Sequence, residues 1–146
     1  MGFLLNVSSP LANSIDLGKE SITNVKITTD IPVDSDARST YLGTTLTIKG
    51  KIISEVDGDN DVDQVTAIGK WALVPAEKAD SYRSVTVKVI TASLTVREYV
   101  LPNAFVVDYF ENYGDTDGTG TFTLILKQKK NKIQSVSITG GFDAAV

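Results

Sequence analysis

The sequence predicts a mainly β protein, an antiparallel β-sandwich or barrel with one helix, formed by residues 1–146 as a single domain. β-Branched residues alternate with polar ones at period two over most of the chain. Clusters of Gly, Asp, Asn and Pro separate these runs, as turns do. One segment alone has apolar residues at helical spacing. With 146 residues, of which 42% are hydrophobic, the chain is long enough to bury one core.

Two strands are predicted in the first half of the chain. Residues 21–29 carry spaced Ile and Val side chains, and the Asp- and Pro-containing segment 30–36 follows as a loop. Over residues 45–52 the even-numbered positions are apolar or Gly and all the odd-numbered ones are polar, which predicts a long half-buried strand. Gly50 interrupts this strand and indicates a bulge.

The helix is predicted to start after an acidic run and to end before Pro75, which cannot continue a helix. Asp or Asn at its start can cap free backbone N–H groups. The apolar positions that define it are Val62, Val65, Ile68 and Ala72. Residues 71–74 are also consistent with a short buried strand, so the sequence leaves both possibilities open there.

The second half of the chain predicts further strands, to give about seven in total. Segments 85–89 and 94–97 alternate apolar and polar residues on either side of 91–93, which indicates a hairpin. An apolar run follows Pro102, and a Gly- and Asp-rich turn over 112–120 leads into the next strand. The side chains expected to share one face of that strand are Phe122, Leu124 and Leu126. A last strand is predicted from Ile133 to Thr139.

Composition excludes several functions. The chain has no Cys and no His, so disulfides, thiolate or imidazole metal ligands and His-based catalytic triads are absent. The net charge of −4 opposes non-specific nucleic-acid binding. The first residues lack the basic and apolar regions of a signal peptide, and no apolar run is long enough to insert into a membrane. We therefore expect synthesis in the cytoplasm.

The acidic run of residues 57–63 invites comparison with a calcium loop, since hard cations bind several oxygen ligands. Val62 stands where an EF-hand needs Gly, and Ile68 stands where it needs Glu. A solvated loop that caps the helix explains the same residues, so no metal and no cofactor are expected.

Catalysis is not expected either. Residues 115–120 resemble the Asp-Thr-Gly signature of aspartic proteases, but here the order is Asp-Gly-Thr in a segment that suits a turn. Ser and Lys are plentiful, yet no Gly-x-Ser-x-Gly motif supports a Ser–Lys dyad. The chain is predicted not to be an enzyme, and a peptidase with a carboxylate or Ser–Lys site is kept as an alternative.

The basic run of residues 127–132 lacks the interleaved aromatic side chains on which RNA bases stack. It indicates a solvated strand end or a protein interface. Six aromatic residues are interpreted as core or subunit contacts: Trp71, Phe105, Tyr109, Phe110, Tyr113 and Phe122.

Three successive segments carry a resemblance to a known family: Val85–Val89, Arg97–Tyr109 and Gly118–Leu126. They contain a hairpin strand, a strand with Leu-Pro-Asn-Ala followed by apolar residues, and a final β segment, after the candidate helix. This order resembles the second half of tail-tube proteins, the superfamily of the haemolysin-coregulated protein of type VI secretion and of phage tail-tube subunits.

The resemblance implies a structural subunit that forms a hexameric ring with its own copies and belongs to the tube, a connector or the baseplate of a phage-tail-like or contractile injection particle. Its partners would be itself and other tail or baseplate proteins. A β-sandwich module that binds a small ligand or glycan is an alternative. Stacking of rings through opposite charges is predicted to involve Asp57, Asp59, Asp61, Asp63, Lys127, Lys129, Lys130 and Lys132.

Overall fold

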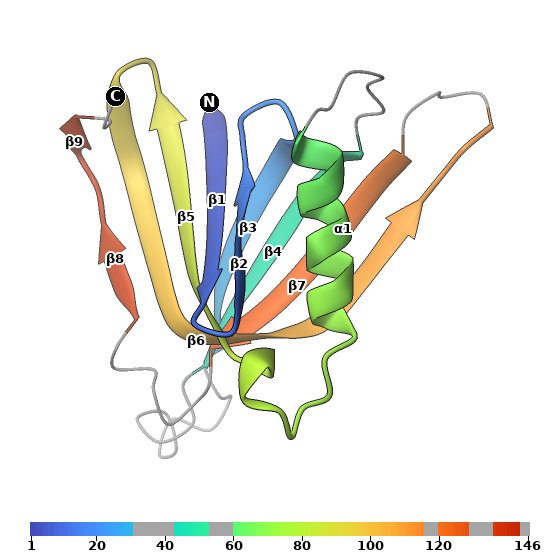
Figure 1. Cartoon of the computed structure of the whole chain (residues 1–146). Coiled ribbons are helices and arrows are strands. Elements are labelled where there is room, and N and C mark those ends of the chain that lie inside the picture. Colours follow the sequence, from blue (N-terminus) through green and yellow to red (C-terminus); the bar gives the residue numbers. More distant parts are fainter. Residues whose placement is uncertain (31–42, 53–59, 116–119, 129–135, 144–146) are drawn as a thin grey trace.

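The computed structural model describes residues 1–30, 43–52, 60–115, 120–128 and 136–143, which form one antiparallel sheet and a helix (Figure 1). The strands are β1 (Gly2–Ser9), β2 (Ala12–Leu17), β3 (Ile22–Asp30), β4 (Gly43–Ile52), β5 (Arg83–Thr91), β6 (Leu94–Asn112), β7 (Gly120–Gln128), β8 (Ser137–Thr139) and β9 (Phe142–Asp143). The helices are α1 (Asn60–Ala72) and the short 3-10 turn η2 (Ala79–Ser81). The prediction of a mainly β fold with one α-helix is confirmed.

The sheet folds into two layers because β6 belongs to both. Its strand order is β2-β1-β5-β6-β7-β4-β3. The first part of β6 pairs with β5, and also with β8 and β9, whereas the part from Ala104 to Asn112 pairs with β7. Helix α1 contacts β2, β4 and β6 and covers one open side between the layers (Figure 1).

Irregular pairing lets β6 pass from one layer to the other. Between Leu101 and Ala104 the strand has more residues than the facing part of β5, and this segment contains Pro102, which has no N–H to donate. Val107 is a second extra residue, because Val106 and Asp108 face consecutive residues of β7. Such bulges bend a strand and increase its twist.

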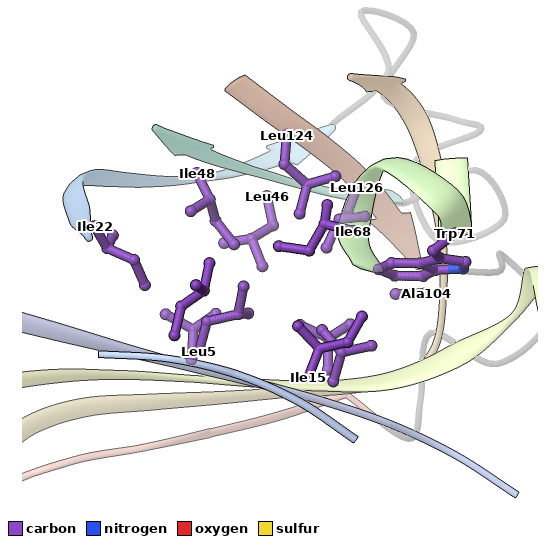
Figure 2. Packing of buried hydrophobic residues seen from close by; sticks show 14 of the residues in the cluster. Leu5, Ile15, Ile22, Leu46, Ile48, Ile68, Trp71, Ala104, Leu124 and Leu126 are labelled. Carbon is purple, nitrogen blue, oxygen red and sulfur yellow. The ribbon is translucent and has the colours of Figure 1, made fainter. Parts of the chain in front are cut away.

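The core lies between the two layers and α1 (Figure 2). The even-numbered faces of β4 and β7 are buried as predicted, including Phe122, Leu124 and Leu126. Val65, Ile68 and Trp71 bury the inner face of α1 at helical spacing. Trp71 therefore belongs to the helix, which resolves the two possibilities left open for residues 71–74.

The hairpin of β1 and β2 was not predicted from the sequence. Its turn, at Pro10 and Leu11, lacks the Gly, Asn or Asp that usually mark a two-residue hairpin. The last strand is predicted from Ile133, whereas the described strand β8 starts at Ser137, and residues 129–135 lie outside the described part.

Two local expectations also need correction. The bulge near Gly50 lies in the neighbouring strand β3, at Thr23, while Gly50 itself pairs regularly with Phe122. In β6, Thr95 is buried and Leu94 is 41% exposed, the reverse of what the apolar pattern favours. A register irregularity beside Thr95, opposite Val89 and Ile90, changes which side chains point inward.

Candidate functional site

Most side chains of the predicted charged surfaces fall outside the part of the chain that the structure describes. This holds for Asp57, Asp59, Lys129, Lys130 and Lys132. Asp61 and Asp63 lie in the first turn of α1. Lys127 is half-buried near the end of β7, in register with Thr45 and Phe105.

The described members of the two predicted charged surfaces lie toward opposite ends of the sheet. Ile52 pairs with Gly120 at the end of β4 that precedes α1, whereas Lys127 lies at the other end of the same ladder. In Figure 1, α1 begins at the upper end of the sheet, and β7 runs downward from there. The backbone of the described residues therefore keeps the start of α1, with Asp61 and Asp63, apart from Lys127 within one subunit.

A buried cluster that the sequence reasoning missed connects α1, η2 and β5. The guanidinium of Arg83 lies over the Trp71 ring, 5.2 Å from its centroid, and its Nη2 donates to Asp80 Oδ2 at 2.7 Å. Trp71 Nε1 donates to the carbonyl of Ser81 at 3.0 Å. These contacts hold the end of α1 against the start of β5.

The β1–β2 hairpin joins the cluster through Ser9, whose hydroxyl donates to Asp80 Oδ1 at 2.6 Å. This hydrogen bond is the main reason that the pKa of Asp80 lies below its ordinary 3.8, and Arg83 lowers the pKa further, while partial burial opposes both. Arg83 and Asp80 neutralise each other within the cluster. Its contacts position the β1–β2 hairpin, η2 and α1 relative to β5.

The sequence did carry a signal for this cluster. Arg83 occupies the same alternating face of β5 as the buried Val85 and Val87. A charged residue at an inward position is buried only when it is paired. Its partners, however, lie in η2 and α1, and the sequence has no spacing from which they could be identified.

A groove of about 760 Å³ lies between α1 and the second half of β6. Gly69 and Leu73 line it from the helix, and residues 106–111 line it from the strand. The Tyr109 ring packs against Gly69, where a Cβ would come within 3.4 Å of Tyr109 Cε1. A small residue at this point of the helix lets the ring approach closely.

Glu111 holds two tyrosines beside this groove. Its carboxylate oxygens accept hydrogen bonds from the hydroxyls of Tyr109 and Tyr113, each at 2.6 Å. Burial, followed by this contact, raises the pKa of Tyr109, whereas the hydrogen bond to Glu111 is the main cause of the raised pKa of Tyr113. Both phenols stay protonated and act as donors.

Apolar side chains are exposed around the same groove. Leu73 is 82% exposed, Phe110 is 50% exposed and Tyr113 is 63% exposed. Trp71 and Phe122 are buried in the core. The predicted aromatic set is thus divided between core residues and exposed ones, and the exposed members gather on β6 and the segment that follows it.

The second half of β6 also has an open edge. Residues 105–112 pair with β7 on one side, and none of the described strands pairs with their other side. An open strand edge presents N–H and C=O groups to any strand that can reach it. An open edge bordered by exposed apolar side chains is typical of an interface between chains.

The described ranges hold no group of three or more Asp, Glu, His or Cys side chains that could bind a metal ion. Within them, every buried side-chain nitrogen and oxygen has a hydrogen-bond partner. None of the described helices is long and apolar enough to cross a membrane.

A two-layered antiparallel sheet with one helix on its open side is the Hcp-like tail-tube fold. Hcp1 from Flavobacterium johnsoniae matches with a TM-score of 0.58 and 21% identity, over 98% of this chain and 99% of its own. A chain of the anti-feeding prophage baseplate, determined by cryo-EM and 6-fold symmetrised, matches with a TM-score of 0.55 and 15% identity, over 95% of this chain and 93% of its own. No protein-family model and no curated protein sequence matches the chain.

Proposed function

We propose that this chain is a structural, non-enzymatic subunit of a phage-tail-like or contractile injection apparatus, where it forms a ring with its own copies as part of the tube, a connector or the baseplate. The observation that carries the proposal is the fold, which is shared along almost the whole chain with a component of a 6-fold symmetrised baseplate. The sequence resemblance to tail-tube proteins agrees with it.

The surface of the subunit supports self-association. The exposed apolar side chains of Leu73 and Phe110 border an open strand edge rather than being scattered over the molecule. A subunit that paired this edge with another copy would cover both features at once. A contact between two different surfaces of the same subunit either closes into a ring or continues as an open filament. The proposed role requires the closed ring.

The positions of Asp61 and Asp63 at the start of α1 and of Lys127 near the other end of the sheet support stacking of such rings. Stacking in one direction needs two different, complementary faces on each subunit. Asp61 and Asp63 at the start of α1 and Lys127 near the end of β7, with the acidic residues and lysines adjacent to them in the sequence, would supply these two faces. Exposed charge pairs contribute only about 0–1 kcal/mol each, so they would orient rings rather than hold them tightly.

Multi-angle light scattering of the purified chain over a wide concentration range, together with negative-stain electron microscopy, tests the proposal. The expected result is a species with the mass of six chains that appears as a ring. A particle of other mass without a central opening, or a monomer at every concentration that is also not incorporated when preformed tube or baseplate is offered as a template, contradicts it. Saturable binding of an oligosaccharide by such a monomer would favour the binding-module alternative.

A further inference from the structure

We infer that the open edge of β6, residues 105–112, is the surface that receives the next copy of this chain, and that the strand it receives is β3 of that copy. This inference rests on the proposed ring and adds which two edges form its contact. The contact is heterologous, because it uses two different edges of the same subunit.

The two edges lie at opposite sides of one layer of the sheet. The second half of β6 and β3 are the two outermost strands of the layer β6-β7-β4-β3. Among the described residues, β3 pairs with β4 alone. Because every neighbouring pair in this layer is antiparallel, β3 runs opposite to β6. A copy placed beside β6 in the same orientation would continue the antiparallel order across the subunit boundary.

A row of paired residues crosses this layer from β3 to β6. Lys26 on β3 is in register with Thr47 on β4, Thr47 with Ile125 on β7, and Ile125 with Asp108 on β6. Directly paired residues of neighbouring strands share one face of a sheet. Lys26 and Asp108 are therefore the two ends of one row on one face, and both side chains are exposed.

The row gives the contact a charge match. Joining β3 of one copy to β6 of the next without an offset in register places Lys26 beside Asp108, and opposite charges at such cross-strand positions stabilise a pair. Because the two strands run antiparallel, the exposed Asn24 of β3, two residues before Lys26, then lies opposite Phe110, whose ring is half exposed on an isolated subunit. The contact therefore covers the Phe110 ring and at the same time pairs Lys26 with Asp108.

The other open edges fit less well. On β2, the exposed Asp16 would bring a second negative charge toward Asp108, and its backbone N–H already donates to Gln64 Oε1 at 2.8 Å. The strands β8 and β9 have three and two residues, against nine in β3 and eight in the open part of β6. Of the described edges, β3 alone combines sufficient length with the complementary charge.

Cross-linking tests the contact directly, because the chain contains no cysteine of its own. A variant with Asn24→Cys and Phe110→Cys, treated with a short bis-maleimide, should give a ladder of covalent oligomers larger than dimers, since each copy then has one thiol at each edge. The matched control carries Ser14→Cys on β2 together with Phe110→Cys and should give no ladder. A ladder from the control alone, or dimers from Phe110→Cys by itself, overturns the assignment of the edges.

Charge reversal tests the row. Lys26→Glu and Asp108→Lys should each weaken assembly by roughly 2- to 10-fold per contact, and the variant that carries both should recover it. Lys49→Glu makes the same charge change on the same face of the central strand β4, and it should leave assembly unchanged. Equal loss with Lys49→Glu, or no recovery in the double variant, contradicts the pairing.

Light scattering of the unmodified chain separates the two levels of inference. Rings without a ladder from the Asn24 and Phe110 variant reject the β3–β6 contact and leave the proposed function standing. If no ring or larger assembly forms under any condition, with or without a template, both are rejected. Circular dichroism of each variant at a concentration that keeps it monomeric must match the unmodified chain, so that lost assembly is not mistaken for unfolding.

Discussion

The guanidinium of Arg83 covers the indole ring of Trp71, and the two side chains together join α1 to β5. Trp71 also donates to Ser81, and Arg83 to Asp80, so the same pair fixes η2. The turn between the helix and the second half of the sheet is thereby held at both ends. The stability of this turn should therefore depend on Trp71 and Arg83.

Removing this arginine should destabilise the monomer. We expect Arg83→Ala to cost about 2–3 kcal/mol in urea unfolding, because it removes the stacking on Trp71 and leaves Asp80 without its charge partner. Arg97→Ala, at an exposed position of β6, serves as the control and should stay within about 0.5 kcal/mol of the unmodified chain. Equal costs for the two variants would show that the cluster does not stabilise the fold.

Asp80 should make stability depend on pH on the acidic side. Its pKa is below 3.8 in the folded state, so its carboxylate stabilises the fold above the ordinary value, and this contribution is lost as pH falls through the folded pKa. Because Ser9 is the main cause, Ser9→Ala should raise the pKa of Asp80 toward 3.8 in an NMR titration. An unchanged titration in Ser9→Ala would refute the assigned cause.

Gly50 should not tolerate a side chain. A Cβ there would overlap the carbonyl oxygen of Ser21 and the ring of Phe122, and the carbonyl belongs to backbone that cannot turn away. We expect Gly50→Ala to destabilise by about 1–3 kcal/mol in denaturant unfolding. Gly18→Ala is the comparison, since a methyl group at Gly18 would have no atom within 4 Å, and it should be close to neutral.

Ala92 is in a left-handed backbone conformation, with φ of 53°, at the turn between β5 and β6. For L-residues this conformation costs about 1–2 kcal/mol, and Gly avoids that cost at the expense of some entropy. Ala92→Gly should therefore raise stability by up to about 1 kcal/mol, measured as a higher thermal midpoint. A lower midpoint would mean that the turn is not strained.

Ring stacking should depend on salt if the charged runs form the contact. Replacing Lys129 and Lys130 with Glu should impair stacking of rings while leaving single rings intact, and reversing Asp59 and Asp61 to Lys in the same chain should restore it. Exposed charges are screened over about 8–10 Å at physiological ionic strength, so stacking of the unmodified chain should weaken as salt rises. Stacking that is unaffected in the Lys variant at low and high salt would assign the lysines to a solvated surface.

Regular alternation made much of this fold predictable. Strands β3, β4, β5 and β7 and helix α1 follow from local periodicity, because each buries one face against a single layer. The β1–β2 hairpin and the full length of β6 do not, since one turns at Pro10 and Leu11 without a turn signature and the other continues through Pro102. The hairpin and the length of β6 are determined by strand pairing and bulges, which depend on the neighbouring strands as well as on the local sequence.

The site was less predictable for a related reason. The charged runs were identified because their residues are adjacent in the sequence, and most of their side chains lie outside the described part of the structure. The row that ends in Lys26 and Asp108 contains one residue from each of four strands. No spacing along the chain reveals such a row until the register of every strand is known.

The arrangement of β6 has a consequence for how the chain folds during synthesis. On leaving the ribosome, β1 must wait for β5, which begins at Arg83, and β4 must wait for β7, which begins at Gly120. Neither layer can be completed from the first half of the chain, and β6, which joins the layers, lies between these two late strands. Folding should accordingly be slow and largely post-translational, because the decisive contacts are distant in sequence, and the unpaired early strands are the stage at which the nascent chain is most open to aggregation.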